Sequence, residues 1–302
     1  MLHHFTRSIA HIALPDKFTY PFHYTPHPLC VMAADEVQVY LQHQAQWQDE
    51  LQQGKMFGVL IVQTTEGEIG YLAAFSGILA GKNIHPYFVP PIYDLLQPDG
   101  FFKKEEEHIS AINHRIRELE EDTAYQECRQ ALEEETARCS RLLSQAKAKL
   151  KAAKELRDCR RQTEQLSESE QAAMIRESQF QKAELKRLER NLKEHLSSLQ
   201  KETDTYISQI EALKNERKSR SATLQQQLFE QFRLLNARGE VKDLCSIFAH
   251  TVHKIPPAGA GECAAPKLLQ YAYSHHYRPV AMAEFWWGNS PKAEIRHHGH
   301  YY

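Results

Sequence analysis

The chain has 302 residues, 25% of them charged, and a formal net charge of −2. This length suits one or two folded domains, and the balanced charge excludes a uniformly basic nucleic-acid-binding protein. The most apolar stretch, residues 69–81, is too short to cross a bilayer, so we expect no membrane contact. The six cysteines lack paired spacing and the N-terminus lacks a secretion-signal pattern, which together predict a cytoplasmic protein with reduced thiols.

Residues 1–102 are predicted to form the first part of a globular α+β domain. A helix is expected over residues 37–53. Residues 57–62 and 69–75 are predicted as the two strands of a β-hairpin. Both strands are nearly continuous in apolar residues, so we expect the sheet to be covered on both faces. The proline-rich residues 85–98 predict a rigid, extended connector.

The next segment, between Phe101 and Arg238, contains neither glycine nor proline, although usual frequencies would give roughly sixteen. Because these two residues break helices, their absence predicts very long helices. Ser167 followed by Glu170 matches a capping box and divides the segment into nearly equal arms. We therefore predict an antiparallel coiled-coil hairpin over residues 103–237, with its turn near residues 166–170. The rival arrangement is one unbroken helix in a parallel dimer.

The two predicted arms, residues 103–165 and 171–237, differ in the quality of their hydrophobic repeat. In the second arm the repeat follows alternating steps of four and three, the heptad signature of a supercoiled seam. Its members are Leu192, Leu196, Leu199, Thr203, Tyr206, Ile210 and Leu213. The first arm loses the repeat through Thr123 and Gln126. We expect its seam to be weak and imperfectly packed.

Charge is distributed unevenly along this segment. Residues 103–135 contain 5 basic and 11 acidic residues, whereas residues 136–193 contain 15 basic and 8 acidic residues. Five cations of the basic part follow steps of four and three and predict a stripe that could track phosphates: Lys147, Lys151, Lys154, Arg157 and Arg161. Lys186 and Arg190 of the second arm complete the predicted RNA-binding set. The alternative is that these residues are simply solvated helix formers.

Residues 238–302 are predicted to complete the globular domain, which would make it one discontinuous α+β domain interrupted by the hairpin. A helix is expected over residues 264–273 and a strand over residues 280–287. The candidate pocket residues of this part are Glu262, Cys263, Lys267, Trp287, Arg296 and His298. Their spacing matches no recognised zinc site, so we predict neither a metal nor a cofactor.

Four segments contain long and specific motifs: residues 71–77, 259–273, 281–288 and 296–302. Together with the helical segment they resemble the long N-terminal extension of a subset of bacterial RluA-type RNA pseudouridine synthases. The resemblance implies a non-catalytic region beside a downstream synthase domain, which isomerises uridine in tRNA or rRNA through the aspartate of a His-Arg-Leu-Asp motif. The nearest match here, residues 114–117, ends in Arg117 instead of that aspartate. We therefore expect this chain alone to be inactive.

Three functions remain open from the sequence. The first is an RNA-binding accessory region of a pseudouridine synthase. The second is a coiled-coil module for protein interaction or dimerisation without nucleic-acid contact, in which Arg217 and Arg220 at seam positions would need acidic partners from another chain. The third is a small enzyme built around Glu262, Cys263, Lys267 and Arg296.

Overall fold

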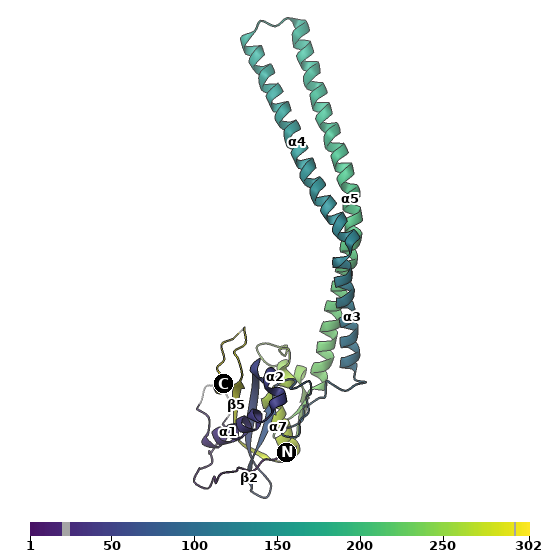
Figure 1. The fold of residues 1–302 in the computed structure, drawn as a ribbon. Helices are drawn as coiled ribbons and strands as arrows, with labels where there is room; N and C mark the ends of the chain where they lie inside the picture. The colour runs from purple at the N-terminus through teal and green to yellow at the C-terminus, as the bar shows by residue number, and fades with distance from the viewer. Residues whose placement is uncertain (20–24, 293) are drawn as a thin grey trace. The chain divides into compact units, whose positions relative to one another are not determined.

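The structure is a computed structural model that describes residues 1–19, 25–292 and 294–302. It divides the chain into two compact units, one made of residues 1–107 with residues 221–302 and the other of residues 108–220. The fold is mixed α+β and contains one very long helix, α5 (Glu168–Gln231) (Figure 1). This confirms the predicted α+β class. Among the described residues, no helix combines the length and apolarity that crossing a membrane requires.

A three-stranded antiparallel sheet forms the centre of the first unit. Strand β1 (Lys55–Gln63) is the middle strand, with β2 (Ile69–Phe75) on one side and β5 (Arg278–Trp287) on the other. The predicted β-hairpin and the predicted C-terminal strand are therefore confirmed. The pairing of β1 with β5 joins residues from both sides of the long helical segment in one sheet.

Helices cover both faces of this sheet. Because successive strand residues point to opposite faces, Phe57 packs with α1 (Pro28–Gln42) in one core cluster, and Leu60 packs with α7 (Ala264–Ser274) in another. Phe57 and Leu60 are both fully buried. The expectation that both faces are covered is confirmed.

The helix predicted over residues 37–53 has different bounds in the structure. It begins at Pro28, because the side chain of His27 caps it and proline is favoured in a first turn. It ends at Gln42, and a 3-10 turn (Ala45–Trp47) and the short helix α2 (Gln48–Gln52) follow.

The second arm ends earlier than predicted. Helix α5 stops at Gln231 instead of Ala237, because Phe232 turns into a core cluster with Leu95 and Phe229 and the next residues pair as strands. The remaining elements of this part are β3 (Arg233–Leu235), β4 (Val241–Asp243), α6 (Leu244–Phe248) and a 3-10 turn (Ala260–Glu262).

In the second unit, α3 (Phe101–Glu121) and α4 (Thr123–Thr163) run in the opposite direction to α5 (Figure 1). Side-chain contacts join residues whose numbers rise in one arm as they fall in the other: Asn113 with Arg217, Tyr125 with Tyr206, Glu135 with His195, and Lys147 with Glu189. The chain therefore folds back on itself here, in contrast to the unbroken helix considered as the rival arrangement.

The turn between the arms contains the capping box expected from the sequence. The Ser167 backbone N–H donates to Glu170 Oε2 at 2.8 Å, and the Glu170 N–H donates to Ser167 Oγ at 3.4 Å. Helix α4 ends at Thr163 and α5 begins at Glu168, which places Ser167 at the N-cap of α5.

The first arm is two helices, where the sequence predicted one. Asp122 separates α3 from α4, and its Oδ1 accepts hydrogen bonds from the backbone N–H groups of Ala124 and Tyr125. An aspartate in this position competes with the helix backbone and starts a new helix. The break falls where the heptad repeat weakens.

The seam of α5 follows the predicted heptad positions. All seven predicted residues are buried or half-buried, and the most buried are Leu192, Thr203 and Ile210. In α4 only Cys139 and Arg157 are buried among the described residues. The first arm therefore contributes less apolar surface to the seam, as its sequence predicted.

Candidate functional site

A groove of about 410 Å³ lies between α4 and α5 in the part of the second unit near the turn. Six cations line it: Lys147, Lys151, Lys154, Arg157, Arg161 and Lys182. Asp158 is the one acid among the described lining residues, and Leu150 and Ser178 complete the wall. The groove therefore has a strongly positive lining in a chain whose overall charge is close to neutral.

The helical repeat explains why these cations meet in one groove. Steps of four and three residues return a side chain to the same face of a helix, so the α4 cations from Lys147 to Arg161 line up along one side. These two residues are 14 positions apart, which corresponds to roughly 21 Å along the helix axis. Lys182 reaches the same groove from α5.

Three of the groove cations form ion pairs at the surface: Lys147 with Glu189 at 3.4 Å, Lys151 with Glu155 at 4.0 Å, and Arg161 with Asp158 at 3.3 Å. Their side chains are 46–80% exposed, and such exposed pairs contribute little stability. Lys154 and Lys182 have no carboxylate within 4.0 Å among the described residues. The cations can therefore exchange their present partners for phosphate at small cost.

Arg157 departs from the predicted exposed stripe. It is only 6% exposed, because it occupies a seam position between the two arms. Its Nη1 donates to Gln181 Oε1 at 2.8 Å and lies 3.9 Å from Glu177 Oε1. Arg157 thus joins α4 to α5, whereas the sequence placed it among freely exposed cations.

We expect Arg157→Leu to leave the melting temperature of the helices nearly unchanged and, if the groove binds RNA, to leave the affinity for RNA within about twofold of that of the original protein. Removing one member of a fully buried ion pair is costly, but the Glu177 side chain is 55% exposed and Gln181 is half-buried, so water can replace the guanidinium at both partners. Circular dichroism and filter binding measure the two quantities. Lys154→Leu is the matched control and should weaken binding without raising stability. A large affinity loss for Arg157→Leu alone would show that its guanidinium contacts RNA.

Lys186 and Arg190, the predicted contributions of the second arm, are exposed on α5 but are not among the residues that line the groove. Arg190 lies 4.0 Å from Glu194 of its own helix. Lys182, which the sequence analysis omitted, does line the groove. It precedes Lys186 and Arg190 at the same step of four residues, so helical spacing could have included it.

The two seam arginines have partners within the chain. Arg217 Nη1 donates to Asn113 Oδ1 at 3.0 Å, and Arg220 Nε donates to Glu216 Oε1 at 2.9 Å. Both side chains are only half-buried and have partners within the chain, so they do not require acidic groups from another chain. The partner of Arg217 is a neutral amide of the opposite arm.

In the first unit, a cavity of about 920 Å³ contains two of the six predicted pocket residues, Cys263 and Arg296. The guanidinium of Arg296 lies 4.7 Å from the ring of Tyr302 and 5.5 Å from that of Trp286. Glu284 also lines this cavity, and burial raises the pKa of its carboxyl group. The sequence analysis did not select Glu284, Trp286 or Tyr302, although all three belong to the motifs it quoted.

The other four predicted pocket residues do not line this cavity, although the Glu262 and Lys267 side chains interact electrostatically with each other and with Cys263. Lys267 Nζ donates to the backbone oxygen of Phe75 at 2.9 Å, and the backbone oxygen of Glu262 accepts from the Gly77 N–H at 3.0 Å. Trp287 is in the core, and the ring of His298 lies 4.1 Å from it. These residues hold the structure around β2 and β5 together.

Of the four residues considered for a small enzyme, Glu262, Cys263 and Lys267 interact electrostatically, and Cys263 and Arg296 line one cavity. Burial raises the pKa of the Cys263 thiol, which disfavours the reactive thiolate. Arg296 pairs with Glu294 at 2.7 Å, and Lys267 is only 3% exposed. Within the described ranges, no group of three or more His, Cys, Asp or Glu residues is arranged to hold a metal ion.

Comparison with known proteins identifies no relative: no family model, no curated protein and no solved structure matches the chain.

Proposed function

We propose that the groove between α4 and α5 binds the phosphate backbone of a folded RNA. The observation that carries the proposal is the groove lining, in which six cations meet one acid. Three further carboxylates, those of Glu155, Glu177 and Glu189, pair with these cations, and the balance is still positive. Neutralising phosphates with lysine and arginine releases condensed counterions and supplies most of the affinity of such contacts. A straight row of cations along a helix suits a regular phosphate backbone.

The chemistry of the groove favours structured RNA over single strands. Single-strand binding relies on aromatic side chains that stack on bases, and none of the described residues lining the groove is aromatic. Duplex RNA is recognised through its shape and its phosphates. Folded tRNA or rRNA is therefore the proposed ligand.

In this proposal the chain is a non-catalytic accessory region of an RNA pseudouridine synthase, and a downstream domain in cis isomerises the uridine. The support for this part is the resemblance of the four motif segments. The residues before and after the hairpin would form one discontinuous domain that carries the RNA-binding arm. The pairing of β1 with β5 supports that arrangement.

The test replaces the five exposed groove cations with glutamine: Lys147, Lys151, Lys154, Arg161 and Lys182. With about five phosphates neutralised, log affinity of the original protein for folded tRNA or an rRNA hairpin should fall with log salt at a slope of about −4. The variant should lose at least tenfold in affinity at about 0.1 M salt and most of the slope. Filter binding at several salt concentrations measures both.

The matched control removes the same number of exposed cations outside the groove: Lys104, Arg117, Lys193, Lys201 and Lys218. It should retain most of the affinity. Equal losses of RNA affinity in the two variants would show that only net charge matters, and would contradict the proposal that RNA binds in the groove. Absence of RNA binding together with concentration-dependent sedimentation would favour the protein-contact function, for which Phe180, 65% exposed on the same hairpin, is the natural contact.

A further inference from the structure

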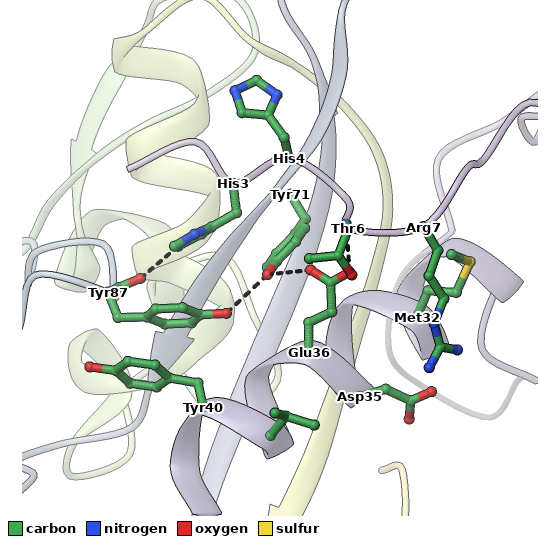
Figure 2. A pocket seen from close by; sticks show the side chains of 11 residues that line it. His3, His4, Thr6, Arg7, Met32, Asp35, Glu36, Tyr40, Tyr71 and Tyr87 are labelled. Atoms are coloured by element: carbon green, nitrogen blue, oxygen red, sulfur yellow. Dashed lines mark hydrogen bonds between the residues drawn. The ribbon is translucent and has the colours of Figure 1, made fainter. Parts of the chain in front are cut away.

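A separate cavity of about 430 Å³ lies in the first unit, between the N-terminal segment, α1 and β2 (Figure 2). Tyr40, Tyr71, Tyr87 and His3 form its aromatic part, and Asp35, Glu36 and Arg7 are its charged residues. His4 also lines it. Its size suits a small organic ligand. The sequence analysis selected none of these residues, because they come from four separate segments of the chain.

Glu36 is the centre of the polar network in this cavity (Figure 2). Its Oε1 accepts from the Thr6 N–H at 2.9 Å and from the Thr6 hydroxyl at 2.6 Å. Its Oε2 accepts from the Tyr71 hydroxyl at 3.0 Å. The Tyr71 and Tyr87 hydroxyls are 2.9 Å apart, and since the proton of Tyr71 is directed to Glu36, Tyr87 donates to Tyr71. These donors are therefore already used within the protein.

Around Glu36 and His3 the remaining polar atoms of the cavity are acceptors, whereas the Arg7 guanidinium and the Tyr40 hydroxyl are donors elsewhere in its lining. His3 Nε2 lies 2.8 Å from the backbone oxygen of Tyr87, so Nε2 carries the proton and Nδ1 is left as an acceptor. Burial lowers the pKa of His3 and favours the neutral ring. Glu36 Oε2 and the hydroxyl oxygen of Tyr87 keep free lone pairs. A ligand group that binds beside Glu36 and His3 must therefore bring hydrogen-bond donors.

Charge and apolar surface narrow the ligand further. Two carboxylates, Asp35 and Glu36, face one guanidinium, Arg7, so the cavity has a negative balance. Asp35 is exposed and forms no ion pair among the described residues. Val39, 52% exposed, and Met32 add apolar surface beside these charges. An organic cation with several N–H donors and an apolar stem complements the free acceptors, the negative charge and the apolar surface of the cavity.

We propose that this cavity binds an organic cation, namely an alkylammonium or guanidinium group on an apolar stem. The cation contacts Glu36 and Asp35, and its stem lies against Val39 and Met32. A free amine or the lysine or arginine side chain of a peptide can supply this chemistry. The proposal is independent of RNA binding, since it concerns a different unit and ligands of opposite charge.

Calorimetry of the full chain tests this with n-butylguanidinium and n-butylammonium as probes and with n-butanol and butyrate as neutral and anionic controls. The two cations should bind at least tenfold more tightly than either control. Spermidine and a Lys- or Arg-containing tripeptide then distinguish the sources, since the true source should bind more tightly than the butyl probes. Equal binding of n-butanol and the cations would overturn the proposal.

Variants at the rim keep the test free of folding effects. Val39→Lys places a competing ammonium at an exposed position and should weaken cation binding at least tenfold, whereas Val39→Met should leave it within about twofold. Asp35→Asn should weaken binding severalfold, and Asp49→Asn, an exposed acid outside the cavity, is its control. Unchanged binding in both Val39→Lys and Asp35→Asn would also overturn the proposal.

Discussion

Gly288→Ala is expected to destabilise the first unit by about 3 kcal/mol or more, because it combines backbone strain with a severe overlap. Gly288 has φ of +104°, and a Cβ there would lie 2.0 Å from the Leu51 backbone oxygen and 2.8 Å from the Cα of Gly54. Gly288, just after β5, and Gly54, just before β1, can approach this closely only because neither residue has a side chain. Urea unfolding followed by tryptophan fluorescence measures the loss.

The control for this substitution is Gly81→Ala. Gly81 also has a positive φ, +70°, but a Cβ there would meet no atom within 4 Å. It should cost only the strain of the left-handed conformation, about 1 kcal/mol. Equal losses at the two positions would show that the contact with Leu51 relaxes and that strain alone matters.

Lys267 is expected to make stability depend on pH in alkaline solution. Burial lowers its pKa to about 8 in the folded protein, whereas an unfolded lysine titrates near 10.4. Between these values the unfolded chain binds a proton that the folded chain has released, so the free energy of unfolding rises with pH. The rise attributable to Lys267 is about 2 kcal/mol between pH 8 and 10.

The measurement is the difference in unfolding free energy between the original protein and Lys267→Met across this range. Other groups titrate there as well: burial raises the pKa of Cys30 and Tyr301 to about 12 each, which lowers stability as pH rises. These effects are present in both proteins and cancel in the difference. Methionine leaves the Phe75 oxygen unpaired at every pH, so only the slope is diagnostic. A flat difference would mean that Lys267 keeps its proton in the folded state up to pH 10.

Local patterns in the sequence predicted much of the secondary structure. Three of these local patterns are present in the structure. They are the apolar runs of β1 and β2, the Ser167–Glu170 capping box and the heptad repeat of α5. The start of α1 was missed because its signal is unusual: a histidine, His27, provides the cap. The helix break at Asp122 was not predicted. The sequence showed only a weakening of the heptad repeat there, because a single capping residue within a helical pattern is a faint signal.

The candidate site was less accessible to the same reasoning. Spacing on one helix placed Lys147 and Lys154 on a common face, but the meeting of α4 with Lys182 depends on the register between the arms. That register also buries Arg157, which spacing alone treats like its neighbours. The cavity around Glu36 depends on tertiary contacts among distant segments, for which a single sequence contains no local pattern.

The interruption at Asp122 gives the two arms unequal bending stiffness. The hydrogen-bond ladder of α5 continues unbroken beside it, with the Tyr206 ring 5.3 Å from that of Tyr125, whereas the ladder of the first arm restarts there. Flexing the hairpin at this level disturbs fewer backbone hydrogen bonds in the first arm than anywhere else along it. The first arm is therefore weakest against bending where the Tyr125 ring meets the Tyr206 ring, and the uninterrupted α5 spans this level.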